Sequence, residues 1–163
     1  MATIAPERKE DRVVFTSGPK GYSVREIIDA AHFRGELEPH WRELLVRIEA
    51  EKKGQASDSE LDDSALDEAA IEFRYKYDLI TAEETERWLE LRSLTLADFS
   101  AYFARSFWQK SLGGHIEPAP MAYGGSPLEL RELLVVELVL TGELDRMATR
   151  LSWRVAAREA TEE

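Results

Sequence analysis

The chain has 163 residues, of which 44% are hydrophobic, enough for one domain with a buried core. It carries 32 acidic and 21 basic residues. The formal net charge of −11 argues against nucleic acid and against an anionic membrane surface as partners, because both require clustered Lys and Arg. There is no cysteine, which excludes disulfides, thiolate catalysis and Cys-ligated zinc.

The first 22 residues predict a mobile segment. The start, MATIAPERKEDR, is charged and has no apolar run of the kind that a secretory signal peptide needs. Val13, Val14 and Phe15 can form one short strand, and Ser17 to Gly21 favour a turn. No segment reaches the roughly 18–20 apolar residues of a membrane helix, so we expect a soluble, cytoplasmic protein.

Capping signals then begin a series of helices. Ser23 with Glu26 forms a capping box, and Gly35 ends that helix. A second helix is predicted over residues 39–54, with apolar residues at three- and four-residue steps. Residues 55–63, QASDSELDD, form an acidic break that is either a loop or the first turns of the next helix.

Three further helices follow before the first Gly-rich segment. One ends near Tyr77 and carries apolar residues along one side. Thr81 with Glu84 begins the next, and Thr95 with Asp98 begins a third, which carries an aromatic stripe and ends at Gly113. Each start has the hydroxyl and the acidic side chain that satisfy the free N–H groups of a helix.

The C-terminal part predicts a helical hairpin. Ser126 and Pro127, with Glu129, give a strong helix start, and Gly142 breaks the chain again. Apolar residues surround most of the helix between them, so it should be buried on several sides. The last helix carries a narrow apolar seam at close to coiled-coil spacing, made of Leu144, Met147, Leu151 and Val155.

The predicted fold class is all-α, a compact bundle of about six to seven helices. Its predicted parts are a mobile segment at 1–22, a helical domain at 23–112, a Gly/Pro-rich linker at 113–126 and a C-terminal helical hairpin at 127–163 that packs on the same core.

One set of residues in the sequence is a candidate metal site. His32, Glu36 and His40 stand four residues apart and would share a face of a continuous helix. Gly35 and Pro39 lie between them and break such a helix. We therefore expect no bound metal, no cofactor and no enzymatic activity.

Nine aromatic residues crowd between Phe73 and Trp108. Aromatic residues at helical spacing usually form a core, but Phe73 and Tyr77 lie on one face of their helix and Tyr75 lies on the other. Aromatic rings outside the core would line a groove for a partner. The predicted peptide- or partner-binding residues are Phe73, Tyr77, Trp88, Phe99, Tyr102 and Phe103.

The segment 44–107 contains a recognisable series of parts: a helix that ends in Gly (44–54), a Ser-Asp-Ser-Glu-Leu start (57–61), aromatic-bearing helices (73–79 and 81–91) and the Leu-Thr-Leu-Ala-Asp-Phe helix (94–103). This series resembles the N-terminal helical chaperone domain of SurA/PrsA-type foldases. In that family this domain holds unfolded or extended polypeptide, and similar modules occur beside systems that mature modified peptides. The 163 residues do not hold a parvulin domain beside it, so the resemblance implies binding without isomerase activity.

The sequence thus predicts a non-enzymatic, chaperone-like module that binds a polypeptide segment or a partner enzyme, with a role in peptide maturation as one setting. A second hypothesis is a structural subunit of a larger assembly, a homo- or hetero-oligomer formed through the seam of Leu144, Met147, Leu151 and Val155. A third is a small helical metalloenzyme that uses His32, Glu36 and His40.

Overall fold

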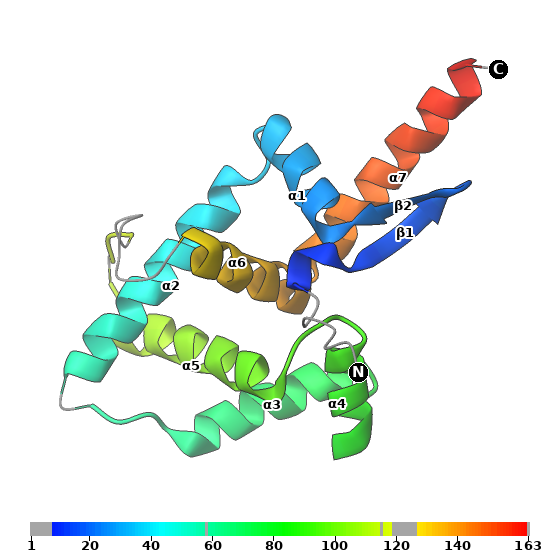
Figure 1. Cartoon of the computed structure of the whole chain (residues 1–163). Helices are drawn as coiled ribbons and strands as arrows, with labels where there is room; N and C mark the ends of the chain where they lie inside the picture. The colour runs from blue at the N-terminus through cyan, green and yellow to red at the C-terminus, as the bar shows by residue number, and fades with distance from the viewer. Residues whose placement is uncertain (1–7, 58, 115, 119–126, 163) are drawn as a thin grey trace, which may run out of the picture.

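The computed structural model describes residues 8–57, 59–114, 116–118 and 127–162. Within these residues the chain forms seven α-helices and one small β-hairpin (Figure 1). The predicted helical bundle of six or seven helices is confirmed, and the hairpin is an addition to it. The helices are α1 (Val24–Phe33), α2 (Glu38–Ala56), α3 (Asp63–Lys76), α4 (Ala82–Glu90), α5 (Leu96–Leu112), α6 (Pro127–Thr141) and α7 (Glu143–Glu162).

Local capping determines most of the helix starts. The capping boxes of Ser23 with Glu26 and of Thr95 with Asp98 both form, at the starts of α1 and α5. Thr81 accepts a hydrogen bond from the backbone N–H of Glu84 and so begins α4. Gly142 takes a φ of 83° between α6 and α7, a left-handed conformation that glycine adopts without strain.

Residues 8–22 belong to the segment 1–22 that the sequence predicted to be mobile, of which residues 1–7 lie outside the described residues. The described residues make a short 3-10 helix, η1 (Lys9–Asp11), and an antiparallel hairpin of β1 (Val13–Ser17) and β2 (Lys20–Ser23). The rings of Phe15 and Tyr22 stack across the hairpin with centroids 4.8 Å apart. Glu10 is buried and forms an ion pair with Arg131 of α6, which attaches this segment to the helical body.

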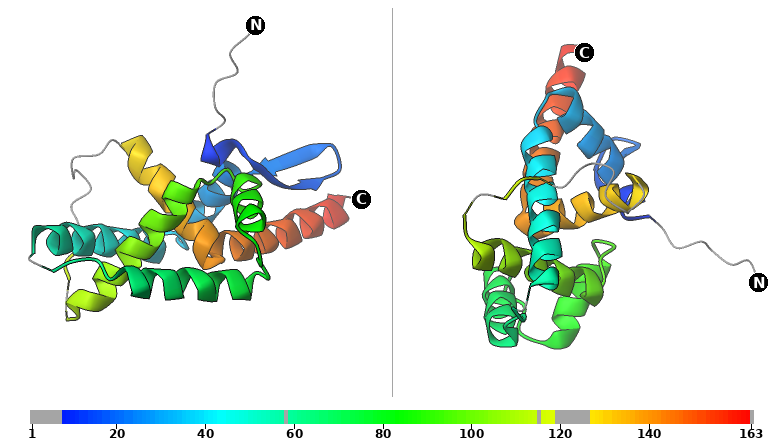
Figure 2. Two further views of the ribbon diagram at one scale, coloured as in Figure 1. Left: turned by 90° about the horizontal axis from the view of Figure 1, so that it is seen from below. Right: turned by 90° about the vertical axis from the view of Figure 1, so that its left-hand side faces the viewer.

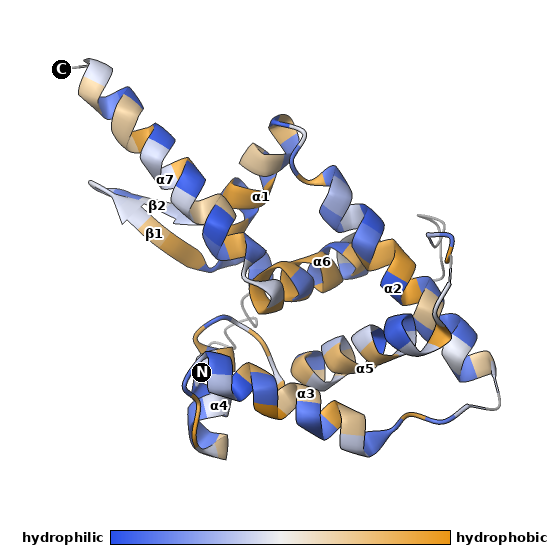
Figure 3. Ribbon diagram, turned by 180° about the vertical axis from the view of Figure 1, so that it is seen from behind, coloured by the Kyte–Doolittle hydropathy of each residue, from blue (hydrophilic) through white to orange (hydrophobic). Residues whose placement is uncertain are grey.

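The helix α6 lies at the centre of the molecule, against α2, α5 and α7 (Figure 1). It is hydrophobic along most of its length (Figure 3). Every residue from Leu134 to Leu140 is buried, including Glu137. The hydrophobic core that contains α6 also includes residues of α1, α2, α3, α4, α5 and α7, so the C-terminal hairpin and the helices before it share one core.

The remaining helices extend from this centre in two directions. The β-hairpin of β1 and β2 lies along α7, and the C-terminal half of α7 projects from the body. The helices α3 and α4 lie at the other end of the molecule (Figures 1 and 2). Most of the predicted linker at 113–126 falls outside the described residues. Its residue Ile116 is buried and packs with Ala50 and Trp108 in a second, smaller cluster.

Candidate functional site

The predicted aromatic residues gather around Phe73 of α3. The Phe73 ring centroid lies 4.6 Å from that of Tyr77, 5.3 Å from Trp88 and 5.3 Å from Phe99, with most of these rings meeting edge to face. Phe103 lies 6.0 Å from Phe73. Edge-to-face pairs at these distances add to the stability gained from burial. The cluster therefore joins α3, α4 and α5 into one rigid unit.

The six predicted binding residues divide into two groups by exposure. Phe73, Phe99 and Phe103 are buried, so they belong to the core, and a partner reaches them only if the cluster opens. Tyr77, Trp88 and Tyr102 are half-buried and pack on the same core; they remain predicted binding residues.

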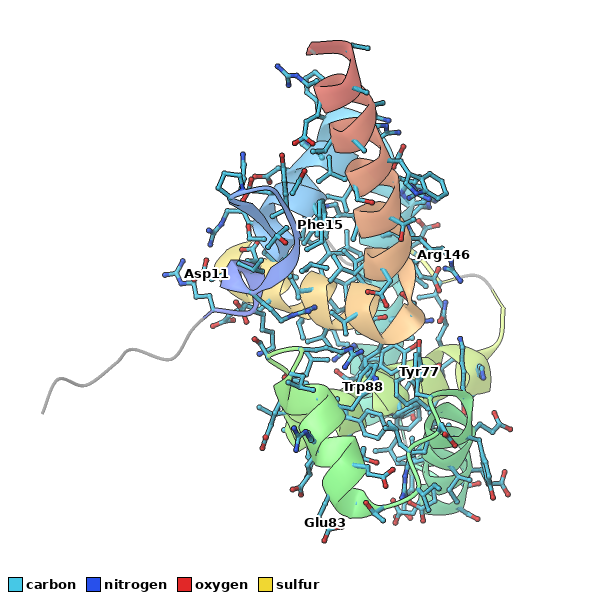
Figure 4. The ribbon with its side chains drawn as sticks, turned by 90° about the vertical axis from the view of Figure 1, so that its right-hand side faces the viewer. Asp11, Phe15, Tyr77, Glu83, Trp88 and Arg146 are labelled. Atoms are coloured by element: carbon cyan, nitrogen blue, oxygen red, sulfur yellow. The ribbon has the colours of Figure 1, made fainter. Side chains whose placement is uncertain are left out.

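Each of the half-buried rings has a cationic neighbour. The Arg92 guanidinium lies 3.8 Å from the centroid of the Trp88 ring, a cation–π contact. Tyr77 and Trp88 lie side by side where α3 and α4 meet the start of α7 (Figure 4). Burial raises the pKa of the Tyr102 hydroxyl, although Arg47 opposes that effect. These half-buried rings thus contribute to the packing between helices as well as to the surface.

The outer face of α3 is different. A groove with a volume of about 430 Å³ lies between α3 and the segment that leads to α4. Three large apolar side chains beside it are exposed: Ile71 at 47%, Tyr75 at 82% and Ile80 at 76%. We call this the α3 groove; its lining residues are Ile71, Arg74, Tyr75, Asp78, Leu79 and Ile80.

The wall of the α3 groove is held in place by hydrogen bonds. Arg74 donates from Nη2 to the carbonyl oxygen of Ile80 over 2.9 Å, and the Ile80 N–H donates to a carboxylate oxygen of Glu84 over 2.9 Å. Both backbone groups of Ile80 are therefore satisfied by side chains of the flanking helices. The exposed Ile80 side chain is thus presented by a fixed backbone, which lowers the entropy cost of binding.

The surroundings of the α3 groove are strongly acidic. Residues 59–91 contain eleven acidic and three basic residues, a large part of the net charge of the chain. Asp67, Glu68 and Glu72 are exposed on α3 and lie within one turn of Ile71. An apolar groove inside an acidic rim is complementary to a segment that combines apolar and basic side chains.

A buried ionic cluster occupies the interface of α2, α5 and α6. Arg47 donates from Nη1 to one carboxylate oxygen of Glu137 over 2.6 Å, and Arg105 donates from Nε to the other over 3.1 Å. Arg47 Nε also donates to Gln109 over 3.0 Å. Each oxygen of Glu137 therefore has a cationic donor, as a buried carboxylate requires. We assign the cluster a structural role, because Glu137 is buried and paired with both arginines.

The predicted metal ligands do not come together. His32 is exposed near the end of α1, and Glu36 lies in the loop before α2, 3.4 Å from Arg150 and 3.6 Å from Arg154 of α7. His40 lies 3.8 Å from Glu143. No group of three or more possible metal ligands occurs within the part of the chain that the structure describes.

The predicted oligomerisation seam faces the chain itself. Leu144 and Met147 are buried in the core, and Leu151 packs against that core from a half-buried position. Val155 is half-buried farther along α7. Because α1 and β1 contact this helix, they cover the seam that the sequence assigned to a second chain. None of the described helices is long and apolar enough to span a lipid bilayer.

The sequence contained a partial signal for the α3 groove. The helical period places Tyr75 on the opposite face from Phe73 and Tyr77, which indicated that its ring would miss the core. Ile71 lies one turn before Tyr75 on the same face. Ile80 gave no such signal, because it follows the helix and its position depends on Arg74 and Glu84.

Comparison with known proteins adds no family to this geometry. The sequence matches no family model, and searches of curated proteins and of solved structures found no similar protein. The candidate site therefore rests on the residues and their arrangement.

Proposed function

We propose that this protein is a non-enzymatic, chaperone-like module that binds a polypeptide segment in the α3 groove. The observation that carries the proposal is the exposure of Ile71, Tyr75 and Ile80 around one hollow. Large apolar side chains gathered in one exposed patch mark interaction surfaces. The resemblance of residues 44–107 to the helical domain of the SurA/PrsA-type foldases supports the same class of function.

The chemistry of the groove favours one kind of segment. Ile71, Tyr75 and Ile80 offer apolar contacts, while the exposed carboxylates of Asp67 and Glu68 surround them with negative charge. A segment with alternating apolar and basic side chains satisfies both features. The aromatic cluster around Phe73 supports the groove from beneath, so the module need not refold to bind.

A selection from a displayed random peptide library tests the proposal. The wild-type protein should enrich peptides that combine Lys or Arg with aromatic or branched apolar residues. A fluorescently labelled member of the enriched set then reports affinity by anisotropy. Tyr75→Ala should weaken binding about 5- to 150-fold, because truncation of a central aromatic residue costs about 1–3 kcal/mol. Thermal unfolding of the variant should match the wild type, since Tyr75 is exposed.

Two further variants locate the binding surface. Phe33→Ala is the matched control, because Phe33 is 91% exposed at the end of α1 and lies outside the groove; it should leave peptide affinity unchanged. Tyr102→Ala tests the half-buried aromatic residues that the sequence predicted. A loss of affinity in Tyr102→Ala with none in Tyr75→Ala would place the peptide on that aromatic surface instead, and an unchanged affinity in both would reject the proposal.

A further inference from the structure

The face of α7 that points away from the core has an exposed tryptophan among arginines. Trp153 is 69% exposed and lines a hollow of about 440 Å³ together with Arg146 and Arg150. Steps of three and four residues place these side chains along one side of the helix, and Arg146 and Trp153 point away from the buried seam. We call this surface the α7 outer face, defined by Arg146, Arg150, Trp153 and Arg154.

The arginines of this face exceed the carboxylates that lie against them. Glu36 is shared between Arg150 and Arg154, at 3.4 Å and 3.6 Å, which are ion-pair distances with weak hydrogen bonding. Arg146 pairs with Glu143. Three guanidinium groups therefore face two carboxylates, and Nε of Arg150 has no hydrogen-bond partner within the described residues.

The carboxylate at the edge of this face already faces other arginines. Asp145 lines the same hollow, but it interacts with Arg12 and Arg92, which approach from the start of the hairpin and from the segment before α5. Burial, followed by repulsion from Arg92, lowers the pKa of Arg12. Counting these groups together, five arginines face three carboxylates, and the region is positive in an acidic protein.

The α3 groove has the complementary features. It is apolar within an acidic rim, and its volume of about 430 Å³ falls in the range of sites that enclose a large ring. The α7 helix runs away from the end of the molecule that holds α3 and α4 (Figures 1 and 4). A copy therefore cannot place its own Trp153 in its own groove.

We propose that the α7 outer face of one copy docks in the α3 groove of a second copy. Trp153 would lie against Tyr75 and Ile80, and Arg146 and Arg150 would meet the acidic rim. Buried tryptophan and arginine are the residues that dominate interface affinity. The proposal rests on the proposed function in one respect, that the α3 groove is a docking surface, and it implies that a bound peptide and a second copy compete for it.

This contact is heterologous, because two different surfaces meet. Each added copy leaves one groove and one α7 outer face free, so copies join in series unless the series closes on itself. We expect one helix face in one groove to bury less than the roughly 1,200 Å² of stable complexes, so the association should be weak and should depend on protein concentration. At high protein concentration the α7 outer face of one copy covers the α3 groove of another. A peptide that binds the groove more tightly displaces that copy.

Sedimentation velocity on the full chain tests the proposal. The average mass of the wild type should rise with protein concentration, and high salt should reduce it, because salt screens the arginine–carboxylate attraction. Tyr75→Asp and Trp153→Asp should each remain monomeric, although both positions are exposed and both variants should melt like the wild type. Phe33→Asp, a charge at an equally exposed aromatic position elsewhere, should associate like the wild type.

The mixture of the two monomeric variants is decisive. Tyr75→Asp retains its α7 outer face and Trp153→Asp retains its groove, so an equimolar mixture should form 1:1 dimers and nothing longer. A wild type that stays monomeric, a Trp153→Asp protein that still associates, or a mixture without dimers would each overturn the proposal. The labelled-peptide assay reads the groove separately, so self-association without peptide binding would reject the proposed function alone, and the reverse result would reject only this inference.

Discussion

The helices α6 and α3 have nearly the same length, 15 and 14 residues, but they use their surfaces in opposite ways. Every residue of α6 from Leu134 to Leu140 is buried, whereas Phe73 is the one buried residue of α3. α3 nevertheless has Ile71 and Tyr75 on its exposed side. The chain covers the apolar surface of α6 with its own helices and leaves part of that of α3 uncovered.

Charge follows the same division. α6 buries one carboxylate, Glu137, and supplies it with Arg47 and Arg105. Residues 59–91 instead display eleven acidic residues against three basic ones. Buried charge must be paired to be tolerated, while unpaired charge at the surface costs little and repels non-specific partners. The difference indicates that α6 maintains the fold and that the outer face of α3 is exposed, as the proposed peptide-binding surface requires.

The largest effect should come from a charge in the centre of α6. Leu134 is fully buried, so Leu134→Asp places a carboxylate without a partner in the core and should destabilise the fold by about 4 kcal/mol or more. Tyr75→Asp introduces the same group on α3 and should cost about 0.5 kcal/mol or less, because Tyr75 is exposed. Denaturant unfolding measures both, and equal losses would show that the two helices do not differ as described.

Glu137→Ala should follow in size. Glu137 is the one charged residue between Leu134 and Leu140, and its side chain is 6% exposed and joins two arginines. Its removal leaves buried guanidinium groups without a counter-charge and should cost about 3–5 kcal/mol. Glu72→Ala on the exposed face of α3 is the control and should be close to neutral. A neutral Glu137→Ala would mean that the arginines reach water without it.

The contrast between these helices also shows what the sequence could and could not predict. The starts of α1 and α5 follow from residues three positions apart, Ser23 with Glu26 and Thr95 with Asp98, and such local signals were sufficient. The burial of Glu137 depends on Arg47, which is 90 residues away in the sequence, and no local pattern contains that information.

The second strand of the N-terminal hairpin and the α3 groove could not be predicted from the sequence, for a related reason. β2 contains Lys20, Gly21, Tyr22 and Ser23, a strand without the usual apolar alternation, and it forms because β1 pairs with it. The exposure of Ile80 depends on hydrogen bonds from two flanking helices. Face assignment from the helical period separated Tyr75 from Phe73 correctly, but it could not show which neighbours cover each face.

Gly54→Ala tests the packing of α2 on α5. The sequence indicated that Gly54 ended its helix, but α2 continues to Ala56 and Gly54 is buried against Trp108. A Cβ there would overlap the indole ring. Alanine should gain about 1 kcal/mol in helix propensity, and the overlap should cost about 1–3 kcal/mol, so we expect a net loss measured by thermal unfolding. In a Trp108→Leu background the same change should stabilise the protein, and persistence of the loss would place its cause elsewhere.

The smallest expected effect concerns Glu51, one turn after Arg47 on α2. Burial raises the pKa of the Glu51 carboxyl above its ordinary value, and the charge of Arg105 opposes this only in part. Between the pKa of an unfolded glutamate, about 4.3, and the raised folded value, the folded state binds more protons than the unfolded state. The contribution of Glu51 to stability therefore falls as the pH rises through that window, and at neutral pH the ionised group is slightly destabilising.

Glu51→Gln removes this titration and keeps the shape of the side chain. The variant should melt slightly above the wild type at pH 7, because the desolvated charge is gone, and the difference should shrink as the pH falls toward 4, where the wild-type carboxyl is protonated. Glu72→Gln, at an exposed position of α3, controls for the loss of one negative charge from an acidic protein. If Glu51→Gln were less stable than the wild type at pH 7, the attraction between Glu51 and Arg105 would outweigh the cost of burial, and Glu51 would belong to the ionic cluster that stabilises the centre of the molecule.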